Sequence, residues 1–211
     1  MDVDPRLVPL LEHPAIWRGR SAARIGVVST GFAALDAHLP GGGWPQVGLV
    51  ELLVPRLGVG ELYLLLPALA RLTAQLPPRW CAFIGAPLPL NAPALAAHGV
   101  TLPQVLVART AAPLWGCEQA LRSGACAVVL SWIERVQPRA LRRLQLAAER
   151  GRTLGVLFRA LSLRTEREPS SAVLRLAVEP TAAGMRIHVI KSRGGLRGAL
   201  DLPLDPGGEY S

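Results

Sequence analysis

The chain has 211 residues, half of them apolar, which is enough for one ordinary domain with a sizeable buried core. Its net charge of +8 is carried by arginine, since Lys191 is the only lysine, and this charge favours polyanions and acidic protein faces as partners. Cysteines without CxxC spacing and scattered histidines argue against a disulfide frame and a metal site, and the absence of a membrane span or signal peptide predicts a cytoplasmic protein.

Residues 1–27 are predicted to form an N-terminal helix or arm outside the main domain. Leu7, Leu10 and Leu11 have helical spacing before Pro14, and the basic stretch WRGRSAAR follows. A tryptophan among arginines is typical of binding hot spots, so we predict that this arm contacts a partner. Packing of its apolar residues on the chain's own core is the alternative. The candidate contact residues are Leu10, Leu11, Trp17, Arg18 and Arg20.

Strand and helix patterns alternate over residues 28–202. Strands are predicted at 48–54, 79–85, 102–108, 125–130 and 153–158, of which the first and the last two are expected to be buried. Helices are predicted at 61–75, 93–98, 114–124 and 138–150. Pro67 predicts a kink or an early break in its helix, and residues 172–202 have the alternation of antiparallel hairpins. We therefore expect an α/β domain, a mostly parallel twisted sheet flanked by helices with an antiparallel C-terminal part, followed by a tail over 203–211.

The order of these segments resembles the RecA-like P-loop NTPase core. Residues 28–52 (VSTGFAALDAHLPGGGWPQVGLVEL) are similar to a RecA run of the form ISTG…LD…GG.P.G.IVEI. Residues 118–132 (EQALRSGACAVVLSW) resemble the helix and strand that carry the Walker B acid. The resemblance implies that the loop after residue 54 takes the place of the phosphate loop.

That loop lacks the residues that make such a site work. Phosphate binding needs a lysine and a hydroxyl, and hydrolysis needs a metal-holding aspartate and a glutamate that activates water. The positions concerned hold Val54, Gly58, Gly60, Glu61, Leu62, Pro87, Ser131 and Ala160. We predict a degenerate nucleotide site with no catalytic residue, metal or cofactor; a weak or unusual RecA-like ATPase or DNA-binding protein is the alternative.

The arm with IWRGR, the altered loop and the phrase EQALRSGAC together resemble the ImuA family, which is RecA-like and often labelled SulA-like. The resemblance implies a non-catalytic adaptor in SOS-induced translesion synthesis. Its partners would be ImuB, a Y-family polymerase-like protein, RecA, and indirectly an error-prone C-family DNA polymerase. It implies a cytoplasmic protein that is nucleoid-associated when engaged, and it leaves direct DNA contact open. A SulA-like cell division inhibitor, which would have to bind the tubulin-like division protein, is a further alternative.

Two basic segments supply the remaining partner-binding candidates. The helix at 138–150 places arginines together, opposite apolar residues that face the sheet, and predicts either a docking surface or a solvated outer face. The stretch VIKSRGG resembles the basic segment that RecA subunits present to a neighbour. The candidates are Arg139, Arg142, Arg143, Lys191 and Arg193. The tryptophans at 44, 80, 115 and 132 are expected to pack near loop ends.

Overall fold

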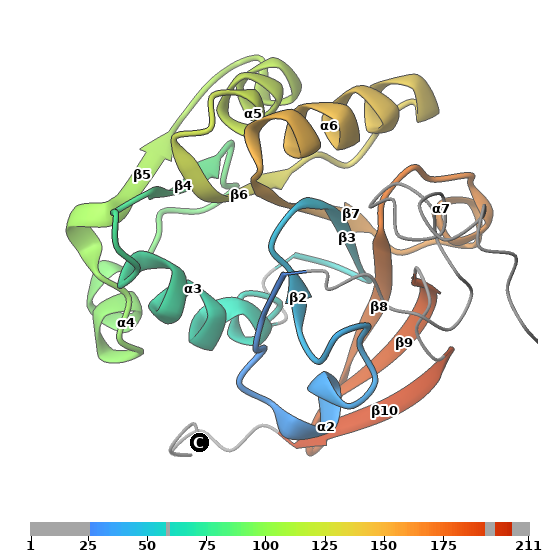
Figure 1. The fold of residues 1–211 in the computed structure, drawn as a ribbon. Coiled ribbons are helices and arrows are strands. Elements are labelled where there is room, and N and C mark those ends of the chain that lie inside the picture. The colour runs from blue at the N-terminus through green and yellow to red at the C-terminus, as the bar shows by residue number, and fades with distance from the viewer. Residues whose placement is uncertain (1–25, 58–59, 193–196, 204–211) are drawn as a thin grey trace, which may run out of the picture.

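The computed structural model describes residues 26–57, 60–192 and 197–203, in which one eight-stranded sheet has helices on both faces (Figure 1). The strands are β1 Val27–Val28, β2 Trp44–Pro45, β3 Gly48–Val54, β4 Trp80–Ile84, β5 Val105–Ala108, β6 Cys126–Trp132, β7 Leu154–Ala160, β8 Leu174–Thr181, β9 Gly184–Ser192 and β10 Gly198–Pro203. The helices are α2 Ala33–Asp36, α3 Leu66–Thr73, α4 Ala92–Ala97, α5 Pro113–Arg122, α6 Pro138–Gly151 and α7 Leu163–Arg167, with 3-10 turns at Tyr63–Leu65 and Leu102–Gln104.

The large sheet has the strand order β10-β9-β8-β3-β7-β6-β4-β5. The strands from β8 to β5 in this order pair in parallel, and β8, β9 and β10 pair antiparallel as a meander. The two-residue strands β1 and β2 form a separate antiparallel pair. Every residue of β3 and β6 is buried, as expected for continuous apolar runs in a sheet covered on both faces.

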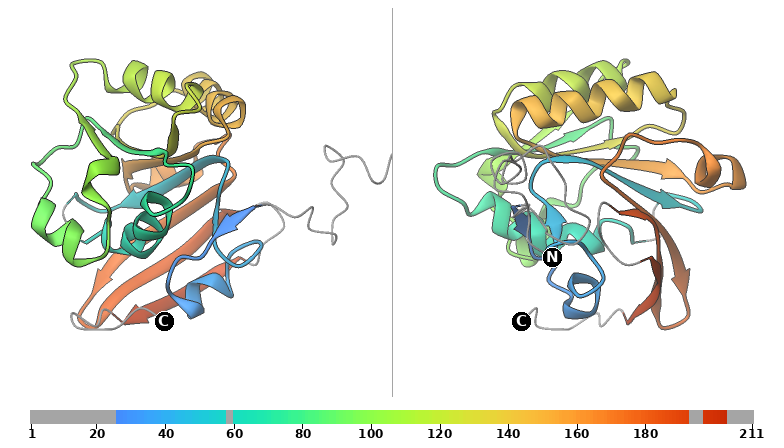
Figure 2. Two further views of the ribbon diagram at one scale, coloured as in Figure 1. Left: turned by 60° about the vertical axis from the view of Figure 1, so that its left-hand side comes forward. Right: turned by 45° about the vertical axis from the view of Figure 1, so that its right-hand side comes forward.

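Helices cover the two faces unequally (Figure 2). Helices α5 and α6 lie together on one face and close a core that includes Leu121, Leu141 and Leu144. The other face packs against α3 and contains an aromatic stack, in which the ring of Trp132 lies 6.3 Å from Phe83 and 4.7 Å from Phe158. No helix among the described residues is long and apolar enough to cross a membrane.

The helix predicted at 61–75 begins later than expected. Glu61 and Leu62 form a turn, a 3-10 turn follows at Tyr63–Leu65, and α3 starts at Leu66. Pro67 therefore lies in the first turn of α3, where its missing N–H has no helical partner to lose. The predicted kink or early break is wrong, because the proline marks the start of the helix and not its middle.

Helix α6 is fixed to its neighbours at several points. On its buried side Gln145 accepts a hydrogen bond from the Leu49 amide at 2.8 Å, which ties the helix to β3. At its carboxyl end Arg152 adopts φ 50°, and the Arg79 guanidinium donates to the carbonyls of Gly151 and Arg152 at 3.3 and 3.1 Å. A Cβ on Gly151 would lie 1.9 Å from the Leu121 carbonyl oxygen, so only glycine lets α6 approach α5 this closely.

Candidate functional site

Charged side chains meet inside the sheet. Glu51, at the middle of β3, is fully buried, and Arg159 of β7 and Arg175 of β8 are only 2% and 3% exposed. Arg159 Nη1 donates to Glu51 Oε1 at 2.7 Å. Arg175 Nε lies 2.8 Å from Glu51 Oε2 as an ion pair, although its N–H is not aligned for a hydrogen bond. One carboxylate thus compensates two buried guanidinium groups, and loss of that carboxylate would leave both uncompensated.

This buried cluster orders the segment that follows β7. Arg175 donates to the backbone carbonyls of Thr165 at 2.6 Å and Glu168 at 3.0 Å. Arg159 Nη2 donates to the Glu168 carboxylate, also at 3.0 Å. Ser162 caps α7 through a capping box with Thr165, which fixes the other end of the turn. The α7 segment is therefore held by the centre of the sheet, although its side chains face solvent.

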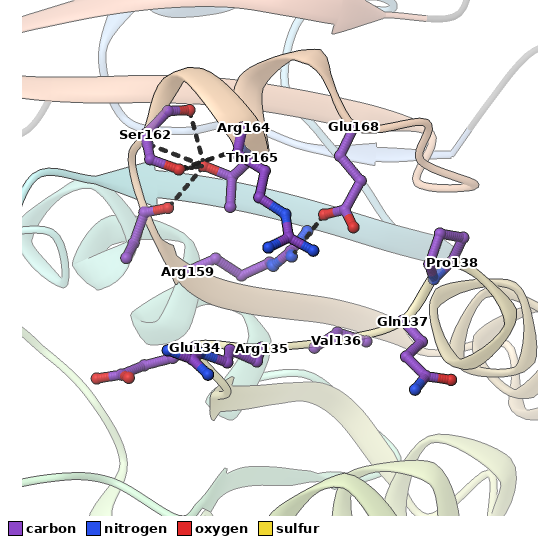
Figure 3. Close-up of a pocket in the computed structure, with 11 residues that line it drawn as sticks. Glu134, Arg135, Val136, Gln137, Pro138, Arg159, Ser162, Arg164, Thr165 and Glu168 are labelled. Atoms are coloured by element: carbon purple, nitrogen blue, oxygen red, sulfur yellow. Dashed lines mark hydrogen bonds and ion pairs between the residues drawn. The ribbon is translucent and has the colours of Figure 1, made fainter.

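A cavity of about 720 Å³ opens beside the cluster. One wall is the segment from Arg159 to Glu168, and the other is the loop 134–138 at the amino end of α6 (Figure 3). Three guanidinium groups and two carboxylates line it, from Arg135, Arg159, Arg164, Glu134 and Glu168. The excess of guanidinium groups suits an anion, which they can bind through charge-assisted hydrogen bonds.

A second candidate surface lies on the outer side of α5 and α6, and we call it the α5–α6 face. Two large apolar side chains are exposed on it, Trp115 by 63% and Leu146 by 52%. Five exposed arginines share these helices: Arg122, Arg139, Arg142, Arg143 and Arg150. Of the five, Arg143 alone forms an ion pair within the described residues, with Glu118. Exposed tryptophan and arginine together are the composition of binding hot spots.

The residues predicted to form a degenerate nucleotide site do not build a phosphate cradle among the described residues. Glu61 is buried, and a Cβ on Gly60, where φ is +91°, would lie 2.9 Å from Met185 Cε. The turn and 3-10 segment after Gly60 separate the loop from the amino end of α3, so that end is not presented at the loop.

The other residues of that predicted site have structural roles or are dispersed. Val54 is buried at the end of β3, and Ser131 donates its hydroxyl to the Ile84 carbonyl at 3.0 Å. Leu62 packs against the core, while Pro87 and Ala160 are exposed. Gly58 lies outside the described residues.

The structure describes the positions of only part of the predicted partner-binding set. Arg139, Arg142 and Arg143 are brought together on the exposed side of α6, as predicted from their spacing. Lys191 instead donates to the Ser170 carbonyl at 2.6 Å and so helps to hold the segment before β8. The remaining candidates lie outside the described residues: Leu10, Leu11, Trp17, Arg18, Arg20 and Arg193.

The three cysteines are buried and free. Burial raises the pKa of the Cys117 thiol to about 12, an effect that outweighs its hydrogen bond with Ser131. Burial likewise raises the pKa values of Cys81 and Cys126. At neutral pH these thiols stay protonated, which does not suit a nucleophile or a metal ligand. No cluster of three potential metal ligands occurs in the parts of the chain that the structure describes.

A family model and a relative both relate this chain to the cell division inhibitor SulA. A family model described as cell division inhibitor SulA matches residues 56–155. The cell division inhibitor SulA of Edwardsiella piscicida is 34% identical over 145 residues, which span 65% of this chain and 78% of that protein. The chain belongs to the SulA family. A crystal structure of SulA from Pseudomonas aeruginosa is 28% identical and covers 53% of this chain and 98% of its own, with a TM-score of 0.45.

Membership of the SulA family corrects several predictions. The assignment to ImuA is wrong, and with it the role in translesion synthesis and the partners ImuB, RecA and the error-prone polymerase, because the matches are to cell division inhibitors. The mixed sheet has helices on both faces, but the matches named above are to SulA and not to a RecA-like P-loop NTPase core, and the described residues of the loop after β3 form no phosphate cradle. The alternative of a SulA-like inhibitor is the one that the matches favour.

The prediction of a non-enzymatic protein agrees with the family description, which names an inhibitor. The argument given for that prediction, a phosphate loop that has lost its functional residues, has no support. The matched segment runs from the end of β3 into β7, so it includes both α5 and α6. The exposed side of these helices thus lies within the segment that matches the SulA family.

The sequence also indicates the buried cluster, through isolated charged residues in apolar strands that were not among the predicted site residues. Glu51 is the single charged residue in the run GLVELLV, and Arg159 and Arg175 are likewise isolated in LGVLFRA and VLRLAV. A lone charge inside an apolar strand predicts a buried pair, because an uncompensated charge there is costly. Trp115 was expected to pack near a loop end, and its exposure is visible only in the folded chain.

Proposed function

We propose that this chain inhibits cell division by binding FtsZ, the tubulin-like division protein, in the cytoplasm through its α5–α6 face. The observation that carries the proposal is the exposed Trp115 beside an arginine-rich helix, both within the segment that matches the SulA family. The alternative for the same surface is a solvated outer face. An exposed tryptophan favours the docking role, because a merely solvated helix face has no need of it.

The chemistry of the face defines what it would bind. Trp115 and Leu146 supply apolar anchors, and burial of an aromatic side chain in a partner's pocket is a large favourable term. Arg139 and Arg142 form no ion pair among the described residues, so they are available to carboxylates of a partner. The complementary surface on the division protein is therefore an apolar pocket with acidic residues at its rim.

Inhibition by this route needs no catalysis. A protein that occupies a contact surface of the division protein removes it from assembly one molecule at a time, so inhibition follows the molar ratio of the two proteins. A catalytic inhibitor would act well below that ratio. A titration of the chain against a fixed concentration of the division protein separates the two, and the proposal expects the effect to saturate near equimolar amounts.

Charge reversal on α6 tests the site. The triple variant Arg139→Glu, Arg142→Glu and Arg143→Glu should bind immobilised FtsZ at least about tenfold more weakly, since each hydrogen bond to a charged group contributes about 1.5–3 kcal/mol. All three arginines are exposed, so thermal unfolding should change little. Arg71→Glu, an exposed arginine on α3, is the matched control and should bind as wild type does.

Trp115→Ala tests the apolar part of the same face. Truncation of a hot-spot tryptophan costs about 2 kcal/mol or more of binding free energy, which is a loss of about thirtyfold in affinity. Absence of binding between the wild-type chain and the division protein would contradict the proposed function. Binding that survives both Trp115→Ala and the triple variant would keep the function but move its site elsewhere.

A further inference from the structure

The cavity between α7 and the amino end of α6 has a floor that is unusual for a protein interior. Arg159 is 2% exposed and lines the cavity, and its Nε has no hydrogen-bond partner in the described structure. Its Nη1 and Nη2 are taken by Glu51 and Glu168. The group is therefore a buried positive charge beneath the cavity, and its field favours an anion above it.

The walls add positive charge around this floor. Figure 3 shows the guanidinium groups of Arg159 and Arg164 and the carboxylate of Glu168 directed toward one another. Arg164 is exposed and forms no ion pair within the described residues, and Arg135 lines the opposite wall. With Arg135 and Glu134 included, three guanidinium groups and two carboxylates line the cavity, which leaves its lining with an excess of positive charge.

The amino end of α6 strengthens the same preference. Gln137 and Pro138, the cap and first residue of this 14-residue helix, line the cavity. The cap makes no side-chain hydrogen bond, and the first turn contains no acidic residue. The partial positive charge of a helix amino end therefore remains uncompensated where the cavity begins, and it favours an anion.

The carboxylate of Glu168 indicates which kind of group binds to the arginines of the cavity. Its carboxylate is bound to Arg159 and is 19% exposed, so an internal carboxylate partly fills the position that an external oxyanion would take. The segment that holds Arg164 and Glu168 is fixed by the hydrogen bonds from Arg175 to the carbonyls of Thr165 and Glu168. The wall is thus preorganised, which lowers the cost of binding.

We propose that this cavity binds a small phosphate-bearing anion, held by Arg164 and the amino end of α6 above the buried charge of Arg159. A volume of about 720 Å³ exceeds what a single phosphate needs and falls in the range of sites for small molecules. The ligand is therefore a phosphorylated small molecule whose remaining part lies against Val136, Pro138 and Ala160. This site goes beyond the proposed function and does not depend on the division protein.

Calorimetric titration of the purified chain with pyrophosphate tests the site without any partner protein. Wild-type chain should show saturable binding with one site, which weakens as salt is added. Arg164→Gln should reduce the affinity at least about tenfold, because it removes a charge-assisted contact. Glu168→Gln should raise the affinity several-fold, because it removes the competing carboxylate. Arg71→Gln, an exposed arginine of α3, is the matched loss of charge and should bind as wild type.

Further arms identify the ligand and give the outcomes that overturn the proposal. Tighter binding of ribose 5-phosphate than of inorganic phosphate would support a phosphorylated small molecule, whereas equal binding would reduce the site to a phosphate site. The proposal fails if pyrophosphate shows no saturable binding, or if Arg71→Gln weakens it as much as Arg164→Gln. Thermal melting of each variant accompanies the titrations; if Glu168→Gln unfolds, the comparison of the Arg164 and Arg71 variants decides.

Discussion

The arginines at the centre of the sheet and those on α6 differ in almost every physical respect. Arg159 and Arg175 are buried, share Glu51 and hold the α7 segment through backbone carbonyls. Arg139 and Arg142 are exposed and have no ion pair in the described part of the chain. The first pair is expected to determine whether the sheet forms, and the second whether the folded protein finds a partner. Net charge alone does not distinguish these roles.

Removal of the shared carboxylate should have the largest effect. Glu51→Gln keeps the shape of the side chain but leaves two buried guanidinium groups without their counter-charge, and we expect a loss of about 3–5 kcal/mol in the free energy of unfolding. Denaturant titration measures it. The matched control is Glu118→Gln, whose partner Arg143 is 63% exposed, and it should cost at most about 1 kcal/mol. Equal losses in both variants would erase the distinction between buried and exposed arginines.

Two leucines on α6 test the same division between stability and binding. Leu144 is fully buried, so Leu144→Ala should lower the free energy of unfolding by about 2–5 kcal/mol. Leu146 is 52% exposed on the outer side of the same helix, and Leu146→Ala should change stability by less than about 0.5 kcal/mol. The order should be reversed for binding to the division protein: when both variants are folded, Leu146→Ala should bind more weakly than Leu144→Ala. A Leu146→Ala variant that binds as wild type would remove that residue from the docking surface.

The thiols give a pH-dependent effect of intermediate size. Folding raises the pKa of Cys117 to about 12. The stability that burial of this thiol contributes is therefore complete below its pKa in the unfolded chain, about 8.5, and declines as pH rises above that value. Cys81 and Cys126 shift in the same direction. A thiol reagent at mildly alkaline pH should therefore react slowly with the native chain and rapidly with all three thiols in denaturant. Rapid reaction of the native chain would contradict the packing of these residues.

The smallest effect is expected at the β9–β10 hairpin. Arg186 donates to Asp201 at 2.7 and 2.8 Å, and these hydrogen bonds lower the pKa of the Asp201 carboxyl. The stability that this pair contributes is present above the pKa of aspartate in the unfolded chain, about 3.9. It is lost as pH falls through the lower pKa that Asp201 has in the folded chain. Both groups are exposed, so Asp201→Asn should shift the melting temperature only slightly, and salt should reduce the shift. A large, salt-independent shift would show that the pair is not screened by solvent.

Local patterns predicted where most elements lie, and single residues show where they stop being sufficient. The run at 48–54 is observed as β3 with the same bounds, because a continuous apolar stretch has few other uses. Pro67 was placed inside a helix because periodicity does not reveal that the chain turns first at Glu61 and Leu62. The cluster around Glu51 needs three strands that are distant in sequence, and strand order is not contained in any one of them.

The candidate site was predictable only in part. Spacing alone brought Arg139, Arg142 and Arg143 to one side of α6. The exposure of Trp115 could not be predicted in this way, because it depends on which side of α5 the sheet leaves uncovered. The resemblance to another family failed because it rested on short separate motifs, whereas the match to SulA extends over the continuous segment 56–155.

Sedimentation of FtsZ polymers in the presence of GTP tests the central claim most directly. Purified wild-type chain should reduce the pelleted polymer in proportion to its molar ratio, and the Arg139→Glu, Arg142→Glu, Arg143→Glu variant should leave the polymer largely intact while it melts at nearly the wild-type temperature. Pelleted polymer that is unchanged by wild-type chain, or reduced equally by the folded variant, would contradict an inhibitor that acts through the α5–α6 face.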